Sequence, residues 1–170
     1  MPQTSPHTND GVTFVPNGSQ NSEYFCHSAC FSTVSGLNIS VCEIRVLVAD
    51  DHKQMLEYVR GLLAAGCEVV GAVNDGQAAL DAALKLRPDV VVLDISMPVL
   101  NGIQAAKRLL EAQPDAKIVF LTVDNDPDTC RAALATGALG YVLKPRLGTD
   151  LIPAIKEAKL GRRFVSQGCE

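Results

Sequence analysis

The chain has 170 residues, a formal net charge of −4 and 47% hydrophobic residues, enough for the core of one domain with or without a tail. The negative charge does not indicate a nucleic-acid-binding surface, and no apolar run approaches the roughly 18 residues of a membrane-spanning helix. The N-terminus lacks the basic and apolar regions of a secretory signal, so we expect a cytoplasmic protein without membrane contact.

Residues 1–43 differ in composition from the rest of the chain. They contain no Lys or Arg, are rich in Ser, Thr, Asn, Pro and Gly, and show no sustained hydrophobic period. This composition predicts a disordered or loosely ordered N-terminal extension. We expect a globular domain over residues 44–161 and a C-terminal tail over residues 162–170.

The globular part alternates short apolar runs with segments of helical periodicity. The third predicted helix begins at Asn101 as its cap, and the fourth has Pro127 in its first turn. The last predicted helix is capped by Thr149 or Asp150, which places Pro153 in its first turn. In chain order, the expected elements are strand 44–50, helix 52–65, strand 67–73, helix 75–87, strand 89–94, helix 101–113, strand 116–122, helix 126–137, strand 140–144 and helix 148–161.

Five strands alternating with five helices predict an α/β fold. Continuous apolar runs are typical of strands that are covered on both faces, so the sheet should be parallel and central. Right-handed crossovers between parallel strands then give a flavodoxin-like, doubly wound five-stranded sheet with helices on both faces. We expect the strand order 2-1-3-4-5.

Polar side chains end four of the five predicted strands. These are Asp50 and Asp51 on the first strand, Asp94 on the third, Thr122 on the fourth and Lys144 on the fifth. Because the working site of such a sheet lies outside the carboxyl ends of its strands, we expect these residues to meet. Clustered carboxylates need a proton or a cation, and hard oxygen ligands suit Mg²⁺. Together with a lysine and a hydroxyl, they suit phosphoryl transfer to Asp94 as the nucleophile, forming an acyl phosphate.

Each of these residues alone has an ordinary structural explanation. An aspartate after a strand is commonly a helix cap or a turn residue, and Thr122 at a strand end commonly bonds its own backbone. An isolated Lys144 is commonly a solvated side chain. The functional interpretation therefore depends on all five residues reaching one edge of the sheet.

Four stretches identify the family that this sequence resembles. They are "VLVADDH", "VVLDISMPVLNG", "IVFLT" and "GALGYVLKP". They resemble the acidic pair, the phosphoacceptor loop, the switch-threonine strand and the aromatic-plus-lysine strand of the CheY-like response regulator receiver domain of two-component systems. The resemblance covers roughly Ile44 to Val165, and within the family the sequence most resembles NarL/FixJ-type receivers.

The resemblance implies a phosphorelay function centred on Asp94. This residue would be phosphorylated by a histidine kinase or a phosphotransfer protein. Asp51, Asp94 and the backbone carbonyl of Ser96 would bind Mg²⁺ directly, and Asp50 would reach the ion through water.

The resemblance also implies a switch. Thr122 and Lys144 would each bind a phosphoryl oxygen, and Tyr141 would be the rotating aromatic that reports the movement of Thr122 at the surface. The face formed by helix four, strand five and helix five would then contact an output protein, and the resemblance also allows a homodimer through this face.

Three classes of function remain open. The first, which we favour, is a signalling module that is not an enzyme beyond Mg²⁺-dependent self-phosphorylation and autodephosphorylation. The second is the receiver part of a truncated NarL/FixJ-type DNA-binding transcription regulator, because "GRRFVS" resembles the same segment of such receivers. No helix-turn-helix follows this segment before Glu170, so we expect no nucleic-acid contact of this chain. The third is a phosphatase of the haloacid-dehalogenase type, whose D-x-D nucleophile lies on the first strand, whereas the better candidate here lies on the third.

Overall fold

The computed structural model of the protein describes residues 43–168. The predicted N-terminal extension lies outside the described residues except for Glu43, and so do the last two residues of the predicted tail. Within the described range, no helix is both long and apolar enough to cross a membrane.

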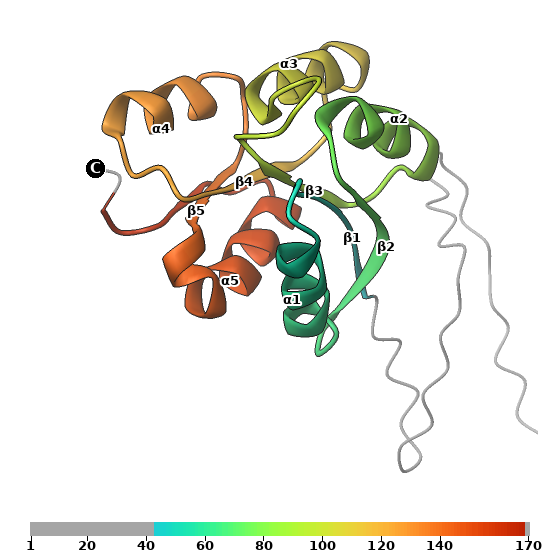
Figure 1. Ribbon diagram of the computed structural model, residues 1–170, viewed down its shortest axis with the longest axis horizontal. Helices are drawn as coiled ribbons and strands as arrows, with labels where there is room; N and C mark the ends of the chain where they lie inside the picture. The colour runs from blue at the N-terminus through green and yellow to red at the C-terminus, as the bar shows by residue number, and fades with distance from the viewer. Residues whose placement is uncertain (1–42, 169–170) are drawn as a thin grey trace, which may run out of the picture. The chain divides into compact units, whose positions relative to one another are not determined.

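One parallel sheet forms the centre of the described domain (Figure 1). Its strand order is β2-β1-β3-β4-β5-β6, and every neighbouring pair is parallel. The first five strands therefore confirm the predicted fold and the order 2-1-3-4-5. The strands are β1 (Ile44–Ala49), β2 (Cys67–Val73), β3 (Val90–Asp94), β4 (Ile118–Thr122), β5 (Gly140–Leu143) and β6 (Phe164–Val165).

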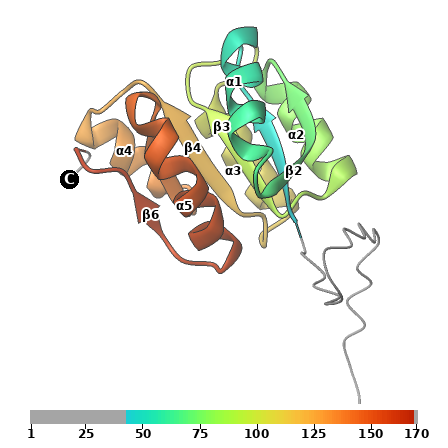
Figure 2. The same ribbon diagram turned by 90° about the horizontal axis from the view of Figure 1, so that it is seen from below.

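The sheet has one strand more than the sequence predicted. Phe164 and Val165, in the segment that we assigned to a C-terminal tail, form β6 and pair with Gly140 and Tyr141 of β5. A two-residue strand is too short to show the periodicity by which strands are recognised in a sequence. Figure 2 shows β6 at the end of the sheet beside the last helix, α5.

Helices cover both faces of the sheet, as expected for a doubly wound fold. In Figure 1, α1 and α5 lie on one face, and α2, α3 and α4 lie on the other. Two buried hydrophobic clusters result, and every residue of β3 and β4 is buried. The helices are α1 (Lys53–Leu63), α2 (Gly76–Leu86), α3 (Gly102–Ala112), α4 (Pro127–Leu134) and α5 (Leu147–Lys159), with a 3₁₀ turn, η1 (Lys144–Arg146), before α5.

Side-chain caps begin the two helices whose starts were most clearly marked in the sequence. Asn101 caps α3 by accepting a hydrogen bond from the Gln104 backbone N–H at 2.8 Å, which confirms the predicted cap. Asp126 caps α4 by accepting from the Thr129 N–H at 2.9 Å, and Pro127 lies in the first turn as predicted.

The last helix begins earlier than predicted. α5 starts at Leu147, directly after η1, so Asp150 lies within its first turn and Pro153 lies inside the helix. The Asp150 side chain is buried and accepts hydrogen bonds from Arg146 instead of capping the helix. The sequence prediction relied on a cap residue and therefore placed the helix start too late, because a helix that continues from a 3₁₀ turn needs no such residue.

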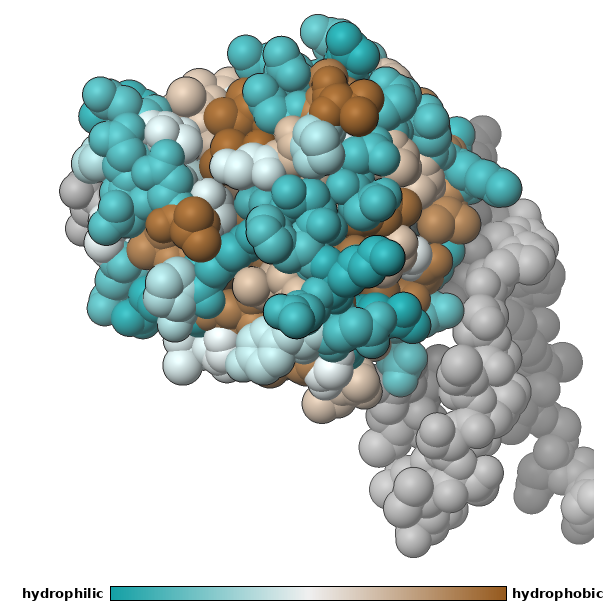
Figure 3. Space-filling view, in the orientation of Figure 1, coloured by the Kyte–Doolittle hydropathy of each residue, from teal (hydrophilic) through white to brown (hydrophobic). Residues whose placement is uncertain are grey.

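The surface seen in Figure 3 is mainly hydrophilic, with hydrophobic side chains in small separate patches. Among the described residues, the most exposed large hydrophobic side chains are Val99, Val123, Leu160 and Tyr58. Val99 follows β3 and Val123 follows β4, so two of the four stand near the sheet edge at which the candidate site residues were expected.

Candidate functional site

The carboxyl ends of β1 and β3 bring two acidic residues to one edge of the sheet. Ala49 of β1 pairs with Leu93 of β3, so Asp50, which follows β1, and Asp94, which ends β3, occupy corresponding positions. Both carboxylates are buried, with Asp50 0% and Asp94 3% exposed. Buried carboxylates are costly unless a cation or a proton compensates them.

Lys144 supplies a compensating charge. Its Nζ lies 2.7 Å from Asp50 Oδ2 and 3.2 Å from Asp94 Oδ2, and its side chain is only 10% exposed. Thr122 of β4 pairs with Leu143 of β5, which places Lys144 just beyond the end of the sheet. The structure therefore joins three of the predicted site residues, Asp50, Asp94 and Lys144, in one buried ion-pair cluster.

The two pKa shifts in this cluster reflect competing effects. Burial raises the pKa of Asp94, the charge of Asp50 adds to that effect, and the attraction of Lys144 does not cancel it. Burial lowers the pKa of Lys144, but the bonds and charges of Asp50 and Asp94 outweigh burial and leave that pKa above its ordinary value. Lys144 therefore stays charged, while Asp94 holds a proton more readily than an exposed aspartate.

Asp51 lies beside the cluster and contacts a histidine that the sequence analysis did not select. His52 Nδ1 lies 2.6 Å from Asp51 Oδ1 and 3.5 Å from Asp50 Oδ1, and the His52 backbone N–H donates to Asp50 Oδ1 at 2.9 Å. Ligand atoms of these three residues all lie within 4.8 Å of one another. His52 directly follows the acidic pair in the sequence, and this adjacency is the signal by which it could have been found.

Thr122 and Tyr141 meet at the segment that follows β4. Thr122 Oγ1 accepts a hydrogen bond from the Asp124 backbone N–H at 3.1 Å, and the Tyr141 hydroxyl donates to the Asp124 carbonyl at 2.8 Å. Both side chains are 0% exposed. The structure therefore places the Tyr141 side chain inward. The rotation that the resemblance implies for this residue stays a prediction.

The loop after β3 holds Asp94 through close backbone packing. A Cβ atom on Gly102, at the start of α3, would lie 2.1 Å from the Asp94 carbonyl oxygen, and the Gly102 N–H donates to the Ile95 carbonyl at 2.9 Å. Ser96 is exposed, and its backbone counteracts part of the rise in the pKa of Asp94. Val99 has a φ of 67°, a sparsely populated conformation for a β-branched residue. A glycine contact, a backbone hydrogen bond and a strained residue thus shape the loop that presents Asp94.

The donor set of this site fits Mg²⁺. Asp50, Asp51 and Asp94 supply hard carboxylate oxygens at one edge of the sheet, which is the ligand type that this ion prefers. The exposed Ser96 lies in the loop that follows Asp94. A cation here would also relieve the repulsion among the carboxylates that Lys144 only partly offsets.

Comparison with known proteins points to one family. Residues 46–156 match the family model described as the response regulator receiver domain. The chain is 39% identical over 126 residues to the response regulator GacA of Pseudomonas aeruginosa, covering 72% of this chain and 58% of that protein. It is 35% identical over 125 residues to the transcriptional regulatory protein DegU of Brevibacillus brevis, covering 72% of this chain and 53% of that protein. The chain thus spans just over half the length of these relatives.

A solved structure agrees with these sequence matches. A two-component response regulator of the LuxR family from Aurantimonas sp. SI85-9A1 superimposes with a TM-score of 0.72 at 29% identity. The match covers 75% of this chain and 92% of that chain. The likeness extends over nearly all of the solved chain, so it supports the same fold for the whole described domain.

Proposed function

Since the chain belongs to the response regulator receiver domain family, we propose that it accepts a phosphoryl group on Asp94 from a histidine kinase or a phosphotransfer protein. Receiver domains of this family interact with histidine kinases and with output domains. The observation that carries the proposal for this chain is the position of Lys144 Nζ, between the buried carboxylates of Asp50 and Asp94. A fixed cation beside a carboxylate nucleophile is what the transfer of an anionic phosphoryl group requires.

In the proposed reaction, a carboxylate oxygen of Asp94 attacks the phosphorus atom of the donor. The new O–P bond forms as the bond from phosphorus to the donor breaks, and the donor leaves with that electron pair. Lys144 would pair with a phosphoryl oxygen, which keeps the attacking and transferred groups in contact despite their like charge. The raised pKa of Asp94 means that this group loses its proton, and so becomes nucleophilic, at a higher pH than an exposed aspartate does.

Mg²⁺ would complete this charge balance when bound, by neutralising the phosphoryl oxygens. Asp51, Asp94 and the Ser96 carbonyl would hold the ion directly, and Asp50 would hold it through water. The chain itself contributes the orientation of these ligands: the His52 N–H and Lys144 fix the Asp50 carboxylate, and Lys144 also contacts Asp94.

Phosphorylation would be transmitted through Thr122 and Tyr141. A phosphoryl group adds charge and acceptor oxygens at Asp94, and the Thr122 hydroxyl would turn to donate to one of them. Thr122 now accepts from Asp124, whose carbonyl also holds Tyr141, so this movement would alter the bonds of the segment after β4. The α4–β5–α5 face would change with it and would bind an output protein or a second copy of the chain.

A second candidate is that this receiver belongs to a DNA-binding transcription regulator. The observation that favours it is that the chain spans 53% of the transcriptional regulatory protein DegU and 58% of GacA. The chemistry at Asp94 would be the same, and the output would be an attached DNA-binding domain. An in-frame helix-turn-helix coding sequence downstream of residue 170 would support this candidate, and a stop codon there would support the stand-alone receiver.

The proposed function is tested by intact mass after incubation with acetyl phosphate and Mg²⁺. We expect one added phosphoryl group on the wild type and none on Asp94→Asn. Asp89→Asn is the matched control, since it makes the same chemical change at the opposite end of β3 and should leave phosphorylation intact. Phosphorylation of Asp94→Asn, or none of the wild type, would contradict the proposal. Steady release of phosphate from a generic phosphate ester would instead indicate a phosphatase.

A further inference from the structure

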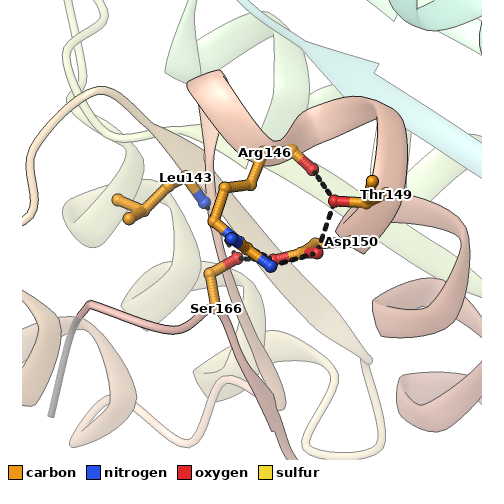
Figure 4. Close-up of polar contacts among 5 residues, drawn as sticks. All are labelled: Leu143, Arg146, Thr149, Asp150 and Ser166. Atoms are coloured by element: carbon orange, nitrogen blue, oxygen red, sulfur yellow. Dashed lines mark hydrogen bonds and ion pairs between the residues drawn. The ribbon is translucent and has the colours of Figure 1, made fainter.

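The residues on both sides of Lys144 are bonded to one buried polar cluster. Its centre is Asp150, 6% exposed on α5, and Ser166, 1% exposed just after β6. Figure 4 shows the Asp150 carboxylate between the side chains of Arg146, Thr149 and Ser166. None of these four residues was selected as a site residue by the sequence analysis, because each reads there as an ordinary helix or tail residue.

Asp150 holds the turn that follows Lys144. Arg146 Nε donates to Asp150 Oδ2 at 2.8 Å, and its Nη2 reaches Asp150 Oδ1 at 3.4 Å. The Thr149 hydroxyl lies 2.7 Å from Asp150 Oδ1 and 3.0 Å from the Arg146 carbonyl oxygen. The bond from Arg146 is the largest of the effects that lower the pKa of Asp150 to about 2, so the carboxylate is ionised at any working pH. The η1 turn is therefore fixed to α5 by charge-assisted bonds.

Ser166 holds the strand that precedes Lys144. Its hydroxyl donates to Asp150 Oδ2 at 2.6 Å and accepts from the Leu143 backbone N–H at 3.3 Å. Its backbone N–H donates to the Tyr141 carbonyl at 2.9 Å, which continues the pairing of β6 with β5. One serine thus links the end of β5, the start of α5 and the C-terminal strand.

We propose that Asp150 and Ser166 are positioning residues for Lys144. They fix the residue before Lys144 and the turn after it, and so hold the ammonium group between Asp50 and Asp94. The short strand β6 thereby supports the phosphoacceptor site, although it lies outside that site. Lifting β6 from β5 would remove Ser166 and slow phosphoryl acceptance. This inference rests on the role proposed above for Lys144.

The first test compares rates of phosphorylation by acetyl phosphate at saturating Mg²⁺ in the full chain. Lys144→Ala should lower the rate about 100-fold, as expected when one electrostatic donor to the transferred group is removed. Asp150→Asn and Ser166→Ala should lower it about tenfold, because a misplaced lysine retains part of its effect. Ser166→Thr keeps the hydroxyl and should restore most of the rate.

A matched control and a second readout distinguish the positioning role of Asp150 and Ser166 from a merely structural role. Asp89→Asn breaks a half-buried ion pair at the other end of the sheet, so it should destabilise the fold without changing the rate. The side-chain ammonium ¹⁵N resonance of Lys144, assigned by its loss in Lys144→Ala, should shift in Asp150→Asn and Ser166→Ala and stay unchanged in Asp89→Asn.

The outcomes distinguish the two proposals. An unchanged rate and an unchanged Lys144 resonance in both cluster variants would overturn the positioning role. A wild type that accepts no phosphoryl group would overturn the proposed function, and the Lys144 resonance alone would then decide the positioning role. If Asp150→Asn does not fold, Ser166→Ala, which removes a single hydroxyl, decides between the same two results.

Discussion

The hydroxyl of Tyr141 donates a hydrogen bond to the backbone carbonyl of Asp124 across 2.8 Å. The N–H of the same residue donates to Thr122 Oγ1 at 3.1 Å. Asp124, in the segment after β4, therefore contacts both of the side chains to which we assign the switch. A movement of Thr122 toward a phosphoryl group would break one of these bonds and change the position of the other, which gives the proposed switch a direct mechanical connection.

Replacing Tyr141 with Phe tests the strength of this connection. Tyr141→Phe removes the hydroxyl from a fully buried ring and leaves the Asp124 carbonyl without that donor, so the free energy of unfolding should fall by about 1 kcal/mol. Urea denaturation measures the difference. Tyr58→Phe is the matched control, because Tyr58 is 58% exposed and should change stability by less than about 0.5 kcal/mol. Equal losses in the two variants would show that the Asp124 bond contributes nothing.

The raised pKa of Asp94 predicts that this residue destabilises the fold at neutral pH. The folded protein binds a proton on Asp94 more tightly than the unfolded chain does, because burial and then Asp50 disfavour the charge. The stability from this group is thus fully present below the ordinary pKa of 3.8 and is lost as the pH rises through the folded pKa. Asp94→Asn should therefore raise the free energy of unfolding at pH 7.

Comparing the free energy of unfolding of Asp94→Asn with that of the wild type at two pH values checks the sign of this effect. The stabilisation by Asp94→Asn should be larger at pH 7 than near pH 4, as measured by denaturant unfolding at each pH. A gain that is identical at the two pH values would mean that the ionisation of Asp94 is not its source. A loss of stability at pH 7 would mean that the attraction between Asp94 and Lys144 exceeds the cost of burial.

Asp89, at the other end of β3, should behave in the opposite way. Burial opposes its ionisation, but hydrogen bonds from the Lys159 ammonium and the Arg45 backbone N–H outweigh burial and lower its pKa. Its contribution to stability is therefore present above pH 3.8 and lost as the pH falls through the lowered pKa. Asp89→Asn should cost about 1 kcal/mol at pH 7, after allowance for partial exposure, and nothing at a pH below the folded pKa.

Denaturant unfolding from neutral to strongly acidic pH measures this difference. Asp128→Asn is a suitable control, since its pairing with Arg131 on α4 is exposed and should contribute little. If Asp89→Asn and the wild type kept a constant difference down to the lowest pH at which both fold, the pairing of the ionised carboxylate would not be its cause.

The close contact of Gly102 with the Asp94 backbone predicts a strong effect of a single methyl group. Gly102→Ala would place its Cβ 2.1 Å from the Asp94 carbonyl oxygen, so α3 and the β3 strand end must separate. We expect the free energy of unfolding to fall by about 2 kcal/mol or more and phosphorylation to be slower. Gly148→Ala on α5 is the matched control, because nothing lies within 4 Å of its added Cβ, and it should stabilise by up to about 1 kcal/mol. Gly102→Ala with wild-type stability would contradict the packing shown here.

The sequence by itself determined the sheet and the edge at which the candidate site residues meet. The continuous apolar runs within β3 and β4 predicted buried parallel strands, and the marked starts at Asn101 and Pro127 predicted where two helices begin. Because side chains that end parallel strands share one edge, the convergence of Asp50, Asp94 and Lys144 also followed from the strand order. These features depend on local pattern and on topology, which a sequence contains.

The tertiary structure alone decided the contacts that join distant segments. β6 is two residues long, and its backbone pairs with β5 through bonds such as that from the Ser166 N–H to the Tyr141 carbonyl, which no local period reveals. The Ser166 hydroxyl adds bonds to Asp150 and to the Leu143 backbone. The inward placement of Tyr141 depends on the Asp124 carbonyl, 17 residues away in sequence. Such bonds form only once the chain has folded, since the entropy of bringing their partners together is offset by the packing of the whole domain.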